Sequence, residues 1–233
     1  MAAMAIQQTL DGEDVPHGGE AEEASPTTAD PRKLGYVGSL TKSSRDSDSW
    51  FTPQRYISAA RDALGGHISL DPFSSPEANS VVKAERFLSE SDNAFKTTWF
   101  PASREGETQT RTVWMNPPYG AGLVNDAIGI FLNEFASGSF DEGIVLVNNA
   151  TETKWFQAAI KQASALTLTN HRIAFWNADG KAVSGNTRGQ AFFYFGPRPE
   201  TFVQRFSEFG FSCVLPSGSS PSDFSDDALP LDF

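Results

Sequence analysis

The stretch Thr112-Val-Trp-Met-Asn-Pro-Pro-Tyr-Gly120 runs from an apolar segment directly into a stiff polar corner. Its first four residues have the composition of a buried strand, which we expect to end at Asn116. Consecutive prolines fix φ near about −65° and hold the preceding residue in an extended conformation. The side-chain carbonyl of Asn116 and the main-chain carbonyl of Pro117 are therefore not used in a helix or a sheet. Pro118 has no N–H with which to close the loop, and the ring of Tyr119 follows.

Apolar runs alternate with helical patterns on both sides of this stretch. We expect strands at 67–70, 112–115, 143–147, 165–169 and 191–195, and helices at 53–64, 76–87, 123–135, 151–163 (capped by Thr151) and 201–209. This alternation predicts an α/β fold with a mostly parallel sheet flanked by helices. Ligands of such sheets bind at the carboxyl ends of the strands. Asp71 and Asn116 each follow an expected strand at that edge.

The folded domain is expected to cover residues 48–215. Residues 1–47 and 216–233 are rich in small, polar and acidic residues, which predicts disordered tails. These tails hold most of the formal net charge of −11. The C-terminal tail ends in the apolar sequence Leu229-Pro-Leu-Asp-Phe233, which we interpret either as a docking segment for a protein partner or as a loose end.

Composition excludes several classes of protein. No apolar run approaches the ~18–20 residues of a membrane span, and the N-terminus lacks the pattern of a signal peptide. Cys213 is the only cysteine, which excludes an internal disulfide and a zinc site built on several thiolates, and which fits a reducing compartment. The three histidines are too dispersed to predict a metal site.

Positive charge gathers in one part of this acidic chain. Residues 153–205 contain seven bases against two acids, a net charge of +5, which is suited to holding phosphates. Scattered bases on a solvated surface are the alternative. Within this region, residues 170–190 form a polar segment that we expect to project as a loop or hairpin carrying Arg172, Lys181 and Arg188. The neighbouring aromatic residues, Phe175, Trp176 and 192–195, are candidate stacking groups, but the alternating Phe-Phe-Tyr-Phe of 192–195 is interpreted as core.

The Asn-Pro-Pro-Tyr corner suits one kind of chemistry. An exocyclic amine has two N–H donors, and the carbonyl oxygens of Asn116 and Pro117 are two rigid acceptors for them. Tyr119 can stack on the attached ring. This pattern is typical of methyltransferases that modify adenine N6, cytosine N4 or an amide nitrogen. The alternative is a strand followed by a Pro-Pro turn in which Asn116 bonds local backbone groups.

The chain resembles the phage-type DNA N6-adenine methyltransferases, the Dam-like family. The matching segments are Trp50-Phe-Thr-Pro53, Leu70-Asp-Pro-Phe-Ser-Ser-Pro-Glu-Ala-Asn79, Ser91-Asp-Asn-Ala-Phe95 with Trp99, 116–120, Asn149-Ala-Thr-Glu-Thr-Lys-Trp-Phe156, His171-Arg-Ile-Ala-Phe175 and Gly189-Gln-Ala-Phe-Phe-Tyr-Phe-Gly196. The resemblance implies a Rossmann-like methyltransferase fold, S-adenosylmethionine as the methyl donor and double-stranded DNA as the partner. It also implies a flipped adenine, with GATC as a candidate site, and a phage or prophage protein in the bacterial cytoplasm.

The resemblance also implies roles for individual residues. It assigns donor binding to Thr52, Pro53, Asp71, Pro72, Asp92 and Asn116, catalysis to Asn116, Pro117 and Tyr119, and contacts to DNA to Pro118, Tyr119, Arg172, Lys181 and Arg188. Asp71 would lie near the methionine end or ribose of the donor, Asp92 near its adenine, and Thr52 and Pro53 near its carboxylate. The alternatives are a helix cap for Asp71, a surface acid for Asp92 and plain helix capping for Thr52 and Pro53.

Two rival functions remain open on the sequence alone. The same corner serves enzymes that methylate cytosine N4 in DNA, adenine in RNA or a protein glutamine. A relative that binds DNA without catalysis could also keep the fold. A cysteine-dependent mechanism has no support, because Cys213 lies beyond the matching segments.

Overall fold

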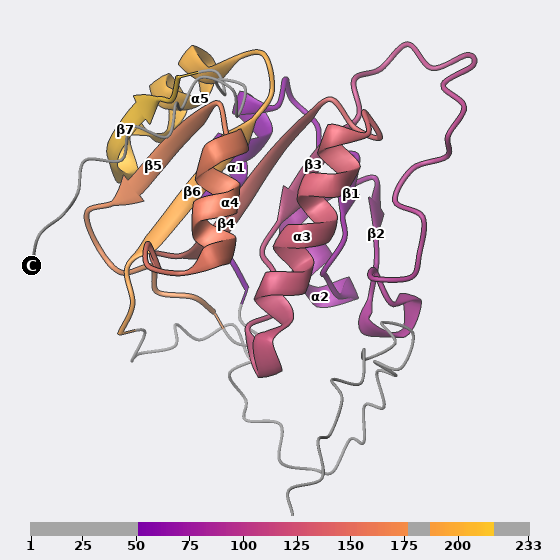
Figure 1. The fold of residues 1–233 in the computed structure, drawn as a ribbon. Helices are drawn as coiled ribbons and strands as arrows, with labels where there is room; N and C mark the ends of the chain where they lie inside the picture. The colour runs from indigo at the N-terminus through magenta and orange to yellow at the C-terminus, as the bar shows by residue number, and fades with distance from the viewer. Residues whose placement is uncertain (1–50, 177–186, 217–233) are drawn as a thin grey trace, which may run out of the picture. The chain divides into compact units, whose positions relative to one another are not determined.

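The computed structural model describes residues 51–176 and 187–216, and within them seven strands form one sheet in the order β2-β1-β3-β4-β6-β5-β7 (Figure 1). The strands are β1 (Leu70–Asp71), β2 (Arg86–Phe87), β3 (Thr112–Met115), β4 (Glu142–Asn148), β5 (Ala165–Thr169), β6 (Gln190–Phe195) and β7 (Gly210–Val214). The helices are α1 (Gln54–Ala63), α2 (Pro76–Val82), α3 (Leu123–Ala136), α4 (Lys154–Gln162) and α5 (Pro199–Phe206), with short 3-10 turns η3 (Glu90–Asp92), η4 (Gly120–Gly122) and η5 (Ser207–Phe209).

The sheet is mixed, although most of its strands share one direction. β2, β1, β3 and β4 are paired in parallel. β6 runs antiparallel to both β4 and β5, so β5 has the direction of β4, while β7 runs opposite to β5. The expected α/β sheet flanked by helices is confirmed, and the expectation of a mostly parallel sheet holds for strand direction only. β6 and β7 thus share one direction, opposite to that of the other five strands, and α5 and η5 lie between them in the chain.

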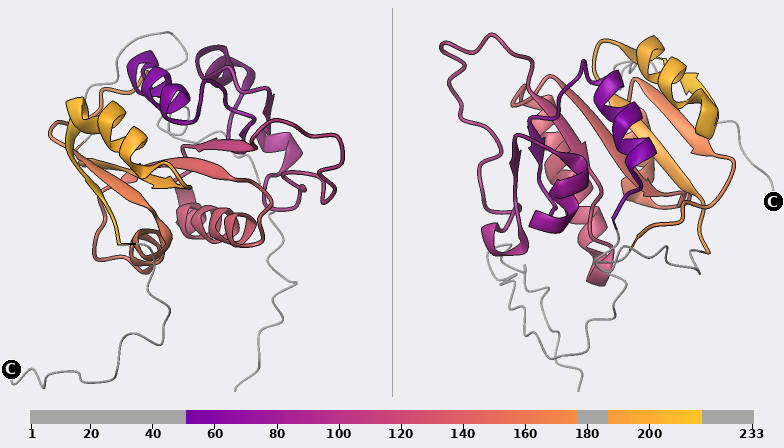
Figure 2. Two further views of the ribbon diagram at one scale, coloured as in Figure 1. Left: turned by 90° about the horizontal axis from the view of Figure 1, so that it is seen from above. Right: turned by 180° about the vertical axis from the view of Figure 1, so that it is seen from behind.

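Helices cover both faces of the sheet. Figure 2 shows α1 and α5 on one face and α3 and α4 on the other. Alternate residues of the central strands supply two separate cores: Ile144 and Leu146 of β4 pack on the α1 side, and Val145 and Val147 pack on the α3 side. This two-sided burial explains the continuous apolar run of β4. The aromatic residues 192–195 of β6 are fully buried, so their interpretation as core is confirmed.

Several elements differ from the sequence predictions. The strand expected over 67–70 is β1, which covers only Leu70–Asp71. The helix expected over 76–87 ends at Val82, because Lys83 adopts a left-handed conformation (φ 52°) and the side chain of Asn79 accepts a hydrogen bond from the N–H of Ala84 at 2.8 Å. The chain then forms β2. The cap of α4 is Thr153, whose Oγ1 accepts from the N–H of Phe156 at 3.3 Å, and not Thr151. β2 and β7 are strands that no predicted pattern covered, and the helix expected over 201–209 begins at Pro199 and gives way to η5.

Some predictions fall outside the described residues. These are the whole N-terminal tail, the C-terminal tail except Pro216, and Lys181 with the middle of the expected 170–190 hairpin. Only the two arms of that hairpin, up to Trp176 and from Thr187, are described.

Candidate active site

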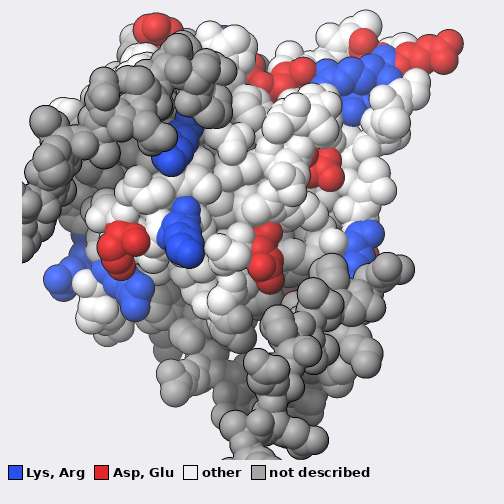
Figure 3. Space-filling view, viewed as in Figure 1, with Lys and Arg blue, Asp and Glu red and all other residues white. Residues whose placement is uncertain are grey.

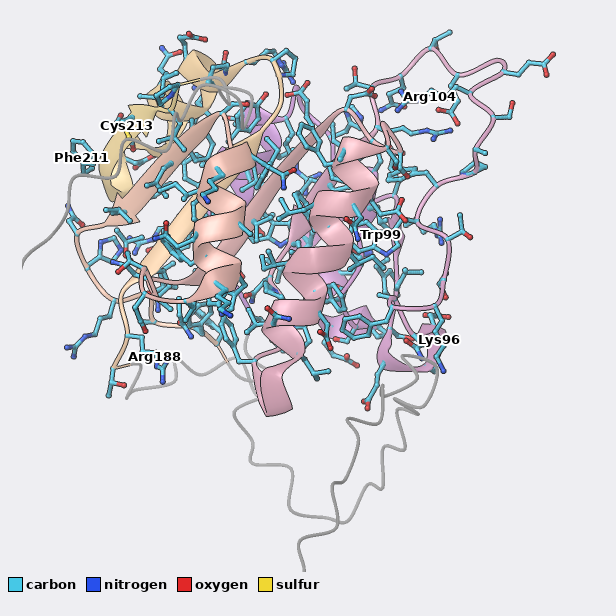
Figure 4. The ribbon with its side chains drawn as sticks, in the orientation of Figure 1. Lys96, Trp99, Arg104, Arg188, Phe211 and Cys213 are labelled. Atoms are coloured by element: carbon cyan, nitrogen blue, oxygen red, sulfur yellow. The ribbon has the colours of Figure 1, made fainter. Side chains whose placement is uncertain are left out.

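The predicted site residues follow neighbouring parallel strands at the same edge of the sheet. Asp71 ends β1, Asn116 follows β3, and Asn148 ends β4. Because β1, β3 and β4 are parallel neighbours, their carboxyl ends meet at one edge. In Figure 4 this carboxyl edge is the lower one, where Arg188 and Lys96 are labelled. Arg104 is labelled near the opposite, upper edge.

The stiff corner lies where the sequence predicts it, directly after β3. Pro117 is buried, and Asn116 and Pro118 are half-buried. The side-chain nitrogen Nδ2 of Asn116 lies 3.5 Å from Oγ1 of Thr52, to which it donates. This contact joins two residues 64 positions apart in the chain. It uses the side-chain nitrogen of Asn116 and does not involve the side-chain oxygen.

Tyr119 is held by its hydroxyl and offers its ring. The hydroxyl oxygen accepts a hydrogen bond from the backbone N–H of Asn148 at 2.7 Å, while 39% of the residue remains exposed. Burial around the hydroxyl raises the pKa of Tyr119, and the Asn148 N–H and the charge of Arg188 oppose that rise. Tyr119 is therefore a neutral phenol whose ring orientation is set by the end of β4.

Asp71 is a buried carboxyl group with few partners. It is 3% exposed, and burial raises its pKa to about 7, against the lowering effects of the nearby Ser74 hydroxyl and the Phe73 N–H. The Phe73 N–H lies 3.4 Å from Oδ1. Ser74 Oγ is near enough to affect the carboxyl group but is buried without a hydrogen bond of good geometry among the described residues. Since buried polar groups are nearly always bonded, this pair fits a ligand that donates N–H or O–H groups.

Asp71 is not the cap of α2. The cap is Ser75, whose Oγ accepts from the N–H of Ala78 at 3.1 Å. The capping interpretation of Asp71 is therefore wrong. Pro72, which directly follows Asp71, is buried.

The start of α1 has no side-chain cap among the described residues. Pro53 occupies the cap position, and Thr52, which is 7% exposed, contacts Asn116 instead of the helix. The interpretation of Thr52 as a plain helix cap is therefore wrong. An uncapped helix start presents backbone N–H groups that suit an anion such as a carboxylate.

Asp92 is exposed and makes local bonds. It ends η3, and its Oδ2 accepts from the N–H of Ser89 at 2.8 Å and from the Ser89 hydroxyl at 2.6 Å. These bonds lower the pKa of Asp92, so it is a carboxylate at neutral pH. Because η3 follows β2, the neighbour of β1, Asp92 lies beyond the same sheet edge as Asp71.

Arg172 and Arg188 are exposed and flank residues 177–186 on either side. Figure 3 shows Lys and Arg side chains grouped at the lower left of the molecule, the part of the edge where Figure 4 labels Arg188. The charge of Arg188 lowers the pKa of Tyr119.

A polar cluster at the end of β5 was not singled out from the sequence. Nε2 of His171 lies 2.6 Å from the hydroxyl of Tyr56 and 3.0 Å from a guanidinium nitrogen of Arg55, and its Nδ1 lies 2.6 Å from Oδ1 of Asn170. Burial and the charge of Arg55 lower the pKa of His171. The neutral ring therefore donates from Nδ1 and accepts at Nε2. Two of its partners, Arg55 and Tyr56, are over 100 positions away in the chain, so sequence spacing gave no signal of the cluster.

Trp176 is a second exposed aromatic residue near this edge, with 45% of its surface exposed. It differs from Phe175, which is buried. Its backbone forms a bridge with Phe51, with N···O distances of 2.7 and 3.0 Å. The bridge fixes the backbone of Trp176 at the surface, so its exposed ring is available for the stacking that the sequence suggested.

A separate cavity of about 610 Å³ opens at the amino edge of the strands. It is lined by residues between Arg104 and Thr110, by 140–142 and by Pro197, and none of the predicted site residues lines it. Charged groups on its wall are paired, as in the ion pair of Arg104 with Asp141 at 2.8 Å. This cavity is therefore not the candidate active site.

Residues 51–176 and 187–216 contain neither a metal-binding cluster nor a helix suited to a membrane. No group of three or more His, Cys, Asp or Glu side chains there is placed to bind a metal ion. None of the helices found there has the length and apolar composition to cross a lipid bilayer.

Comparisons with known proteins identify the family of this chain. Residues 38–208 match the family model described as DNA N-6-adenine-methyltransferase (Dam). A curated protein of Escherichia phage T1, named DNA N-6-adenine-methyltransferase, is 28% identical over 185 residues, which cover 73% of this chain and 71% of the phage protein. The family match spans every strand up to β6 and the whole Asn-Pro-Pro-Tyr corner. The chain therefore belongs to the DNA N-6-adenine-methyltransferase (Dam) family.

Proposed function

We propose that this protein is a DNA methyltransferase that transfers a methyl group from S-adenosylmethionine to the exocyclic N6 amine of adenine in double-stranded DNA. The observation that carries the proposal is the Asn-Pro-Pro-Tyr corner at the carboxyl end of β3, beside the buried Asp71 of β1. Family membership supports DNA adenine as the substrate.

The corner supplies the groups that hold the target amine. The side-chain oxygen of Asn116 and the carbonyl oxygen of Pro117 accept its two hydrogens, so the nitrogen lone pair is directed out of the plane of the ring. Extruding a base from the duplex costs a few kcal/mol. Stacking on the exposed ring of Tyr119 recovers part of that cost.

Asp71 and its surroundings fit the methyl donor. S-adenosylmethionine supplies an electrophilic methyl group on a sulfonium, along with an ammonium group and ribose hydroxyls that can donate hydrogen bonds. The carboxyl group of Asp71 and the unbonded Ser74 Oγ are suitable partners for such donors, and the uncapped start of α1 suits the donor carboxylate. Asp92 and Pro72 complete the proposed donor side. We propose that the sheet is a Rossmann-like methyltransferase fold on this basis.

Positioning is the main catalytic contribution of the chain. Well-oriented reactants gain on the order of 7–11 kcal/mol in intramolecular systems, and the corner residues are held by bonds to Thr52 and Asn148. Transfer would be a direct displacement, in which the amine nitrogen bonds the methyl carbon as the bond from that carbon to the sulfonium sulfur breaks and the neutral thioether leaves. The product amine then loses a proton to solvent, and no covalent intermediate forms on the protein. Arg172, Lys181 and Arg188 are proposed to contact flanking DNA.

The proposal is tested by incubating the full chain with isotopically labelled donor and unmethylated DNA that contains GATC and other sequences. Enzymatic digestion to nucleosides and mass analysis should identify N6-methyladenine. Label found in N4-methylcytosine, or only in an RNA or protein substrate, would instead establish one of the rival activities.

Asn116→Ala is the matched variant for this assay. It removes one of the two acceptors of the amine and should reduce transfer to background. Donor affinity measured by calorimetry should change little, because Asp71, Asp92 and the start of α1 remain to hold the donor. Near-normal turnover of Asn116→Ala on DNA would contradict the proposed mechanism.

A further inference from the structure

Gln190, the first residue of β6, is a buried amide whose hydrogen bonds reach three segments of the chain. Only 1% of its surface is exposed. Its Nε2 donates to the backbone carbonyl of Arg188 at 2.7 Å and to Oδ1 of Asn148 at 3.4 Å. Its Oε1 accepts from the backbone N–H of Ile173 at 2.9 Å. Both donors and an acceptor site of the side chain are therefore used.

The first bond path from Gln190 leads to the proposed stacking residue. Asn148 uses its side-chain oxygen to accept from Gln190 and its backbone N–H to donate to the Tyr119 hydroxyl. Asn148 is the last residue of β4 and is half-buried, so its position depends on what holds the strand end. Gln190 holds the end of β4 through the Asn148 side chain, and the end of β4 holds the Tyr119 ring through the Asn148 N–H.

The second path leads to the proposed amine-binding residue. Ile173, bonded by Gln190, begins the short run that ends at Trp176, whose backbone is bridged to Phe51. Phe51 precedes Thr52, which accepts from the Asn116 side chain. The two paths therefore start at Gln190 and end at the two sides of the same corner, at Tyr119 and Asn116.

We propose that Gln190 is a positioning residue of the methyl-transfer reaction. It touches neither substrate in this proposal. It fixes the distance between the stacking ring of Tyr119 and the acceptor Asn116, and it holds the backbone from which Arg188 projects. The inference rests on the proposed function, because it assigns Gln190 to the site of that reaction.

An amide is the side chain that this position requires. Two N–H donors meet two oxygen acceptors, and one carbonyl oxygen meets an N–H donor. A leucine has a similar volume but no polar atoms, so the Gln190→Leu variant would lose all three of these hydrogen bonds. A displacement of the strand end by about 1 Å is enough to lower a rate about a hundredfold when positioning carries the catalysis.

The test compares Gln190→Leu with a control on the same strand. Tyr194 lies at the other end of β6, is fully buried, and donates to Glu142 at 2.6 Å. Tyr194→Phe therefore removes a buried hydrogen bond from β6 at the edge away from the site. We measure kcat on saturating DNA, the KM for DNA and the Kd for the donor, at a temperature well below the unfolding midpoint of each variant.

Gln190→Leu should lower kcat by about tenfold to a hundredfold with the donor Kd within about twofold of the original, because Asp71 lies on a different strand. Tyr194→Phe should leave kcat unchanged. Asn148→Ala, which cuts the same path at a half-buried side chain, should also lower kcat, and the two losses should not add. This second variant carries the test if Gln190→Leu does not fold.

Two outcomes would overturn the assignment. One is a Gln190→Leu or Asn148→Ala protein with the original kcat. The other is an equal kcat loss in Tyr194→Phe, which would indicate a general effect of weakening β6. Failure of the proposed function is seen separately, because it appears as the absence of adenine methylation by the unaltered chain. A further measurement does not depend on catalysis. Hydrogen exchange of the Asn148 backbone amide should be faster in Gln190→Leu than in the original chain, because the strand end is held less firmly.

Discussion

Tyr119 combines a fixed hydroxyl with an accessible ring. A side chain that only stacks would need the ring alone, and the sequence supports no more than that. The structure adds the bond from the Asn148 N–H to the hydroxyl oxygen at 2.7 Å. In the proposed reaction the hydroxyl is therefore not idle, because it sets the plane on which the extruded base would lie.

Tyr119→Phe should lower kcat several-fold, since the ring stays but its anchor is lost and the Asn148 N–H loses a partner worth about 1 kcal/mol. Tyr119→Ala should be more severe and should also raise the KM for DNA, because it removes the stacking surface. Single-turnover methylation with each variant at saturating donor checks this order. A Tyr119→Phe rate equal to the original would show that the hydroxyl bond does not position the ring. A Tyr119→Phe rate as low as that of Tyr119→Ala would show a chemical role for the hydroxyl.

At the scale of secondary structure, the contact of α3 with β4 depends on Gly143. A Cβ atom at this position would lie 2.6 Å from Cζ of Phe131 on α3 and 3.0 Å from a ring carbon of Phe140. Both aromatic rings are fully buried in the core on this face of the sheet. The absence of a side chain at Gly143 therefore lets α3 lie close to β4, the strand that ends at Asn148.

Gly143→Ala should destabilise the protein by about 1–3 kcal/mol, because the added methyl group overpacks a filled core. Gly129→Ala is the matched control, since it places the same methyl group on the exposed side of α3 with nothing within 4 Å. It should be neutral or stabilising by up to about 1 kcal/mol, because alanine favours the helix. Urea unfolding curves of both variants give the two differences. Equal midpoints would show that Phe131 and Phe140 move aside without cost.

At the scale of the whole molecule, the parts predicted well are those with a local cause. β3, β4, β5 and β6 follow from apolar runs, and the carboxyl ends of β1 and β3 place Asp71 and Asn116 at one edge by topology alone. β2 has two residues, and β7 has partly exposed ones, so neither leaves a clear apolar pattern.

Contacts between distant segments were not predictable in the same way. The bonds of Thr52 to Asn116 and of Gln190 to Asn148 join side chains whose spacing in the sequence has no regular period. They depend on which strands become neighbours, and the order β4-β6-β5 includes a reversal that the alternation of helices and strands does not reveal. The sequence therefore indicates the reactive groups more readily than it indicates the groups that hold them.

The buried carboxyl group of Asp71 should make the stability of the whole protein depend on pH. Its folded pKa of about 7 lies above the usual value of about 3.9, so the folded state binds this proton more tightly than the unfolded state does. This contribution is fully present below about pH 4 and is lost as the pH rises through 7. Its full size is on the order of 4 kcal/mol.

Asp71→Asn keeps the shape of the side chain but cannot ionise. The unfolding free energy of this variant, relative to that of the original chain, should therefore increase from pH 5 to pH 8. Urea unfolding of both proteins across that range measures the difference. A difference that stays constant with pH would show that Asp71 ionises normally in the fold, and it would also remove the reason to place an ammonium or hydroxyl donor of the ligand beside it.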